Sequence, residues 1–115
     1  MALLLLKHTK DLDEQSTDGS SALLDAVNGN MLNVAKSLLE HGADVNIQNI
    51  KNGITPLMIA CTNENERMIE LLLDYKPDLH ILNNTGLSVT EYAVGALNYN
   101  ILKLLLDKGA NKIKV

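Results

Sequence analysis

The chain has 115 residues, enough for one small domain, and 46% of them are hydrophobic, so it can bury a core. It contains three Tyr but no Phe or Trp, so we expect a core of small aliphatic side chains and no aromatic-lined ligand pocket. The net charge of −4 argues against a nucleic-acid-binding protein, which normally carries a basic stripe.

The sequence pattern contains no convincing signal for secretion or membrane insertion. Cys61 is the single cysteine, which rules out an intrachain disulfide and is typical of a reducing compartment. The N-terminal MALLLLKH lacks the basic start and the apolar length of a signal peptide, and no stretch approaches the roughly 18 apolar residues of a membrane span. We therefore expect an intracellular protein, in the cytoplasm, without a membrane partner.

A repeat runs through the chain, marked by Gly19, Gly53 and Gly86, which are 34 and 33 residues apart. Each glycine is followed at fixed distances by an alanine, by a polar break and by a leucine pair. The matching positions are Ala26, Ala60 and Ala93, then Leu38-Leu39, Leu72-Leu73 and Leu105-Leu106. A period of this length predicts stacked repeats, each a turn and two short helices.

Local signals place the ends of these helices. Pro56 suits the first position of a helix, where its missing N–H costs nothing, and Thr55 or Ser21 can cap the helix that follows it. Gly42 and Gly109 can adopt the left-handed conformation that ends a second helix.

These residues resemble the ankyrin repeat, most clearly in GITPLMIAC and LLEHGADVN, and less closely in GSSALLDAV and GLSVTEYAV. The resemblance implies an all-α solenoid of stacked helix-turn-helix units with β-hairpin or loop fingers. One domain over 1–115 would then comprise a partial repeat (1–18) and three repeats (19–52, 53–85 and 86–115).

The sequence departs from the family pattern at several places. The glycine expected between the two helices is replaced by Asn30, Glu64 and Leu97. Because Glu and Leu adopt the left-handed conformation poorly, we expect altered loops in the second and third units. The extra residue of the first 34-residue spacing is expected around Gln48 to Ile50.

Residues with possible chemistry have structural interpretations. His8 and His41 share a repeat position, but helices packed roughly 8–10 Å apart are too distant for two Zn–N bonds of about 2 Å each. Cys61 follows the packing alanine, which favours burial over nucleophilic reactivity. Asp11, Asp44 and Asp78 recur at the period and are interpreted as turn residues. We find no catalytic motif, and predict no enzyme activity, cofactor or metal.

The resemblance implies a protein-binding module that contacts its partner through the concave face, formed by fingers and first helices. Carried onto this sequence, the candidate partner-binding residues are Thr17, Asp18, Ser20 and Asn28 in unit one, Lys51, Asn52, Ile54, Thr62 and Asn63 in unit two, and Asn84, Thr85 and Leu87 in unit three. The alternative is that they are only solvated surface. Without Trp or Phe, the usual anchors, we expect a polar interface of modest affinity.

A second hypothesis is assembly, either self-association or membership of a longer ankyrin array through uncovered terminal repeats. Residues 1–33 hold five acids and two lysines, whereas residues 101–115 hold four lysines and one acid. Opposite charges at the two ends favour head-to-tail contact. The apolar MALLLL also lacks the polar outer face that terminal repeats normally carry.

Overall fold

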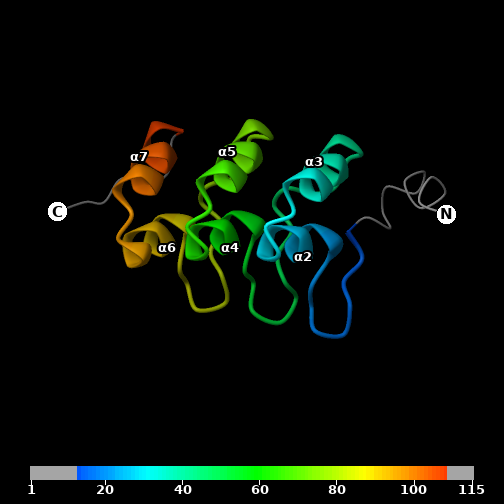
Figure 1. Ribbon diagram of the computed structural model, residues 1–115. Helices are drawn as coiled ribbons and strands as arrows, with labels where there is room; N and C mark the ends of the chain where they lie inside the picture. Colours follow the sequence, from blue (N-terminus) through cyan, green and yellow to red (C-terminus); the bar gives the residue numbers. More distant parts are fainter. Residues whose placement is uncertain (1–12, 109–115) are drawn as a thin grey trace.

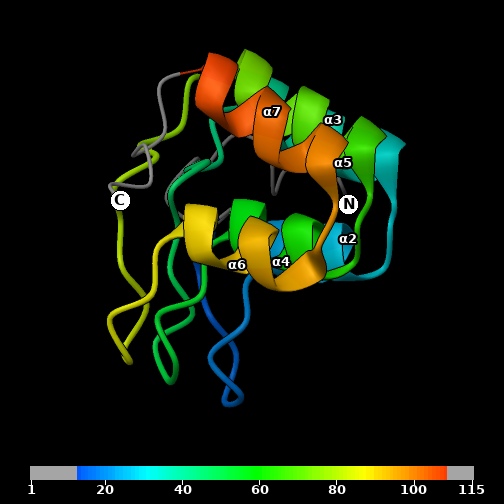
Figure 2. The same ribbon diagram turned by 90° about the vertical axis from the view of Figure 1, so that its left-hand side faces the viewer.

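The computed structural model describes residues 13–108, which contain three stacked helix pairs (Figure 1). Helix α2 (Ala22–Asn28) pairs with α3 (Leu32–Glu40), α4 (Pro56–Thr62) with α5 (Glu66–Asp74), and α6 (Val89–Ala96) with α7 (Tyr99–Asp107). Figure 2 shows the first helices of the pairs in one layer, the second helices in another, and the fingers projecting away from both. The predicted all-α solenoid is confirmed.

The fingers are loops closed by hairpin-like hydrogen bonds, and residues 13–108 contain no β-strand. In each finger one backbone N–H reaches across to a carbonyl oxygen: Ser16 to Ser20 at 2.8 Å, Asn49 to Ile54 at 2.9 Å, and Asn83 to Leu87 at 2.9 Å. A strand needs a longer ladder of such bonds, which these short fingers do not provide.

Capping side chains fix where the helices begin. The Oγ of Ser21 accepts from the Leu24 N–H at 3.3 Å, and the Oγ1 of Thr55 accepts from the Met58 N–H at the same distance. Both predicted caps are therefore confirmed. Asn65 and Asn98 cap α5 and α7 in the same way, since each satisfies a backbone N–H that has no partner inside its helix.

The core lies between the layers and between successive units. Ala26, Ala60 and Ala93 are at most 1% exposed, so the close-packed interior has room for only a small side chain at these points. In the middle unit Leu72 and Leu73 of the predicted pair are both buried. The repeated positions of the sequence are thus the packing positions of the stack.

Hydrogen bonds also join each finger to the next. Gln48 Nε2 donates to the Leu82 carbonyl at 3.0 Å, and the Asn84 N–H donates to the Asn52 carbonyl at 2.9 Å. The Asp78 N–H donates to the Asn46 side chain at 2.8 Å. The fingers therefore hold a fixed register, which makes the surface they form a defined one.

The aspartates at the base of the fingers are turn residues, as predicted. The Oδ1 of Asp44 accepts from the Asn46 N–H, and the Oδ1 of Asp78 accepts from the His80 N–H, both at 2.9 Å. Asp11, the third member of the set, lies outside the described residues. The predicted division into one partial and three full repeats stays a prediction, because residues 1–12 and 109–115 are also outside the described part.

The expectation of altered loops in units two and three is wrong. Asn30, Glu64 and Leu97 have φ values of 57°, 53° and 56°, so all three occupy the left-handed region. Each donates its N–H to a carbonyl three residues earlier, for example Leu97 to Val94 at 3.0 Å. The stacking of the helices requires the same loop in every unit and outweighs the local cost of a side chain there.

A left-handed residue also follows the second helix in units one and two, whether or not it is glycine. Gly42 has a φ of 98°, as predicted, and Lys76 occupies the corresponding place in unit two with a φ of 52°. Gly109 lies outside the described residues.

The extra residue of the 34-residue spacing lies in the tip of the second finger. The Gly53 N–H donates to the carbonyl of Asn49, four residues earlier, whereas Gly86 donates to Asn83, three residues earlier. The insertion therefore falls within residues 50–52, which overlaps the predicted stretch only at Ile50. The side chain of Ile50 is 73% exposed as a result.

Leu97 is 89% exposed, so its main energetic role is the cost of its left-handed backbone. We predict that Leu97→Gly raises the free energy of unfolding by about 0.5–1 kcal/mol, since the relieved strain exceeds the added entropy of the unfolded chain. The control is Asn100→Gly, an exposed helical position in α7 where glycine costs about 0.5–1 kcal/mol. Urea denaturation of both variants measures the difference, and equal destabilisation by both would contradict the prediction.

Candidate functional site

On the side formed by the first helices and the fingers, a hollow lies between units one and two. Its volume is about 310 Å³. Asp18 and Asn52 line it from the fingers, Asp25 and Asn28 from α2, and Ile59 from α4. The hollow therefore has an acidic wall on one unit and an apolar wall on the next.

A second hollow lies between units two and three, closer to the loops between the helices than the first, with a volume of about 460 Å³. Thr62 and Glu64 line it from unit two, and Leu87, Glu91 and Tyr92 line it from unit three. The Tyr92 hydroxyl accepts from Asn83 Nδ2 at 2.7 Å, which anchors this wall to the third finger.

A third hollow, of about 450 Å³, lies between the inter-helix loops of units one and two, and asparagines from both loops line it. The side chain of Asn65 donates to that of Asn30, which links the two loops. Asn63 is exposed here, and its Nδ2 reaches the Asn28 carbonyl only at 3.5 Å.

The structure brings most of the predicted partner-binding residues to this side. Asp18, Ser20, Asn28, Asn52 and Ile54 line the first hollow. Thr62 and Leu87 line the second hollow, and Asn63 lines the third with Asn28. The remaining four lie on the fingers and line none of these hollows: Thr17, Lys51, Asn84 and Thr85.

Several predicted residues also brace the fingers. The Oδ1 of Asn52 accepts from the Ile54 N–H at 2.9 Å, and Asn84 Nδ2 donates to the Lys51 carbonyl at 3.0 Å. Asp18 accepts from Ser16 Oγ and from the Ser20 N–H. These hydrogen bonds, the one from Ser16 first, lower the pKa of the Asp18 carboxyl, so it is ionised at neutral pH. Substitutions at Asn52 and Asn84 would therefore disturb the fingers as well as the surface.

Sequence reasoning missed several side chains that line the hollows, among them Asp25, Ile59, Glu64, Glu91 and Tyr92. Asp25, Ile59 and Tyr92 share one repeat position, directly before the packing alanine; Asp25 is exposed there, whereas Ile59 and Tyr92 are half-buried at the edge of the core. That position alone would have identified them. Glu91 follows Ser88 by three residues, the spacing of a capping box, and its carboxylate accepts from the Ser88 N–H at 2.8 Å.

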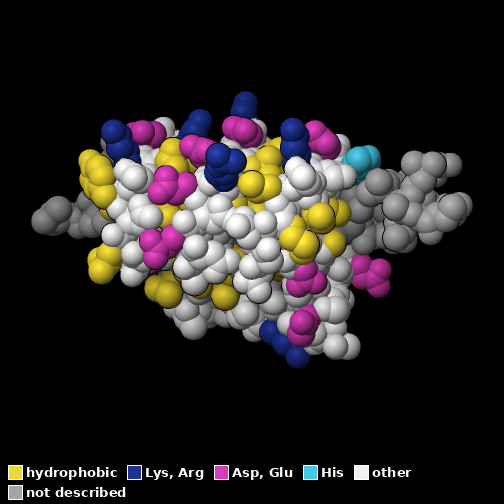
Figure 3. Space-filling view, in the orientation of Figure 1, with side chains coloured by type: hydrophobic (Ala, Val, Ile, Leu, Met, Phe, Trp, Pro, Cys, Tyr) yellow, Lys and Arg dark blue, Asp and Glu magenta, His cyan; other side chains and the backbone are white. Residues whose placement is uncertain are grey.

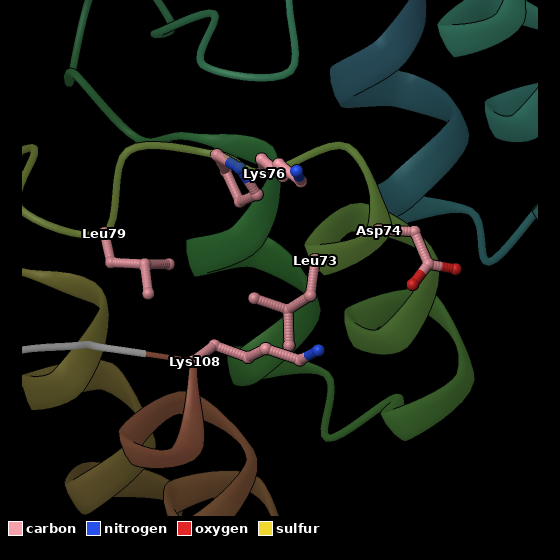
Figure 4. A pocket seen from close by; sticks show the side chains of 6 residues that line it. Leu73, Asp74, Lys76, Leu79 and Lys108 are labelled. Carbon is pink, nitrogen blue, oxygen red and sulfur yellow. The ribbon is translucent and has the colours of Figure 1, made fainter.

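Another hollow, of about 440 Å³, lies where α5 and α7 end (Figure 4). Lys76 and Lys108 line it together with Asp74 and the apolar Leu73 and Leu79. In Figure 4 the Lys108 side chain extends beside Leu73. This hollow contains charges of both signs and lies outside the predicted surface.

The residues with possible chemistry occupy structural positions in the described part. Cys61 is fully buried, and burial raises the pKa of its thiol to about 12. The Nδ1 of His41 lies 2.7 Å from the Ser37 carbonyl at the end of α3, whereas His8 lies outside the described residues. Residues 13–108 contain no cluster of three His, Cys, Asp or Glu that could hold a metal ion. In the same range no helix has the length and apolar character needed to cross a bilayer.

Comparison with known proteins agrees with this geometry. The sequence model of the family described as ankyrin repeats (many copies) matches residues 23–73. The chain belongs to the ankyrin repeat family. Ankyrin repeats generally mediate protein–protein interaction and are generally non-enzymatic.

The ankyrin relatives come from viruses and animals. An ankyrin repeat protein of fowlpox virus is 38% identical over 110 residues, covering 90% of this chain and 32% of the relative. The mouse B-cell lymphoma 3 protein homolog is 32% identical over 101 residues, covering 88% of this chain and 22% of the relative. The NF-kappa-B inhibitor cactus of Drosophila melanogaster is 30% identical over 99 residues, covering 85% of this chain and 20% of the relative. The chain thus spans a third or less of each of these relatives.

Cys61 provides a test of the buried core. Because only the thiolate is nucleophilic, we predict that iodoacetamide at pH 8 modifies Cys61 far more slowly in the folded protein than in urea. The unfolded thiol ionises near pH 8.5, but the folded one does so only near pH 12. The free energy of unfolding therefore falls as the pH rises through that window.

The control for this test is Cys61→Ala, which lacks the thiol and keeps the small buried side chain. Its stability should decline less steeply above pH 8.5 than that of the wild type. Rapid modification of Cys61 under native conditions would show that α4 does not bury it.

Proposed function

We propose that this ankyrin chain is a non-enzymatic protein-binding module that contacts its partner through the concave face of fingers and first helices. One observation carries this proposal. Hollows recur between successive units on this face, and the side chains that line them differ between units, whereas the buried positions repeat. Asp25, Ile59 and Tyr92 occupy one repeat position with three different chemistries, and all three line the hollows.

The proposed partner is another protein, met inside the cell, rather than a nucleic acid or a membrane. Phe and Trp are absent from the chain, so the surface offers few of the side chains that usually dominate binding energy. The fingers present asparagine and threonine instead, which favours a hydrated interface of modest affinity.

Asn63→Arg tests this proposal, because Asn63 is exposed between two units and makes only a long contact to its neighbour. We predict that affinity capture from cells of the source organism recovers a partner with the wild type and loses it with Asn63→Arg. The matched control is Asn33→Arg, the same substitution at an exposed position of α3 in the other layer. Retention of the partner by both variants would contradict this placement of the site.

A second candidate function is association of ankyrin units through the end of the stack. Cys61 and Ile69 of the middle unit are fully buried. Their counterparts in the third unit are less so: Val94 is exposed and Leu102 is partly buried. The following unit accounts for this difference. A second copy, or further repeats of a longer array, would bury the same positions of the third unit.

Sedimentation velocity over a range of protein and salt concentrations tests the second candidate. Self-association predicts a rise in sedimentation coefficient with concentration, weakened by salt if the oppositely charged ends meet, and lost in Val94→Asp. A monomer that does not change over the range would exclude self-association of this chain.

A further inference from the structure

We propose that the concave face binds an extended segment of a partner protein with two cationic side chains about three residues apart, one in each of the two inter-repeat hollows. This inference rests on the function proposed above and adds the chemistry of the partner. The two hollows are the one between α2 and α4, lined by Asp18, Asp25 and Ile59, and the one between α4 and α6, lined by Glu64, Glu91 and Tyr92.

Positive charge is segregated between the two helix layers, whereas acidic side chains occur in both. The first helices α2, α4 and α6 contain no Lys, Arg or His, and their only charged residues are Asp25 and Glu91. Within residues 13–108 the cations other than Lys51 lie on the second helices or directly after them: Lys36, Arg67, Lys76, Lys103 and Lys108. In Figure 3 most of the Lys and Arg side chains follow the upper rim, over the second helices. The concave layer is therefore the anionic one.

The carboxylates of the hollows are held in place by neutral groups. Asp25 accepts from Ser20 Oγ at 2.6 Å, Glu64 from Asn98 Nδ2 at 3.2 Å, and Glu91 from the Ser88 N–H at 2.8 Å. These donors fix the carboxylates without neutralising their charge. Lys51 is the described cation whose charge acts on Asp18, at the finger tips.

Apolar groups complete each hollow. Ile54 and Ile59 line the first, and Leu87 and Tyr92 line the second. An acidic end beside an aliphatic wall suits Lys or Arg, whose methylene stem packs on apolar surface while the charged head meets a carboxylate. The hollows hold about 310 and 460 Å³, ample for one such side chain each.

The spacing of the hollows sets the spacing of the cations. The hollows are separated by one first helix, α4, and packed helices lie roughly 8–10 Å apart. A chain in the polyproline II conformation advances about 3.1 Å per residue and has three residues per turn, so side chains three residues apart lie on the same face and span one repeat. The partner segment would thus run across the first helices, along the stack.

The test uses fluorescence anisotropy with labelled nine-residue peptides that carry two arginines three residues apart, with alanine, leucine and glycine elsewhere. We predict that the full chain binds this peptide with an affinity that falls as salt rises. A peptide with citrulline in place of both arginines keeps the shape but lacks the charge, and should bind at least tenfold more weakly. A peptide with adjacent arginines should also bind more weakly, because it can fill only one hollow.

Charge variants of the protein locate the binding. Asp25→Asn with Glu91→Gln keeps the hydrogen-bond acceptors and should weaken binding of the arginine peptide by about tenfold. Glu40→Gln with Glu70→Gln removes the same charge from exposed positions on α3 and α5 and should change it less than twofold. Lys51→Met should strengthen binding, a direction that a folding defect would not produce.

Three results would overturn the inference: no binding of the arginine peptide at low salt, equal binding of the citrulline peptide, or equal loss in the two double variants. The function proposed above can survive this failure. If Asn63→Arg loses a natural partner that Asp25→Asn with Glu91→Gln retains, the concave face binds a protein whose recognition does not depend on cations.

Discussion

The close contact between the first helices of successive units is the constraint on which the rest of this structure depends. A helix pair of about 20 residues cannot bury its apolar face alone and needs a neighbour on each side. Ala26, Ala60 and Ala93 allow the first helices to approach closely, and this approach brings the fingers within hydrogen-bonding distance of one another. The register of the stack therefore follows from one small side chain in each unit.

Polar side chains of the fingers also hold successive units in register. Gln48 spans two fingers by donating to the carbonyls of Gly53 and Leu82, and Asn52 and Asn84 continue the link on the outer side. Among the described residues no buried side-chain nitrogen or oxygen lacks a hydrogen-bond partner. A loop that would be mobile alone is thus fixed by its neighbours, and the concave face has a defined shape without strands.

This architecture separates the residues that fold the protein from those proposed to meet a partner. The stacking positions repeat from unit to unit, while the position beside the alanine, which lines the hollows, holds Asp25, Ile59 and Tyr92 in turn. The first helices carry negative charge alone, whereas most of the described positive charge lies on or directly after the second helices, which also carry acids. A repeat protein can therefore acquire specificity for a partner without altering the contacts that hold its units together.

The sequence by itself determined the period, the helix caps, the packing alanines and the aspartate turns, because each depends on residues close in the chain or repeated along it. Only the tertiary structure decided the conformation of Glu64 and Leu97. Their local preference opposes the left-handed loop, and the packing of both flanking helices imposes it. The hollows were also decided by the tertiary structure, since their walls combine units one repeat apart. Ser20 and Ile59 face one hollow because the stack brings them together, and no local pattern records that contact.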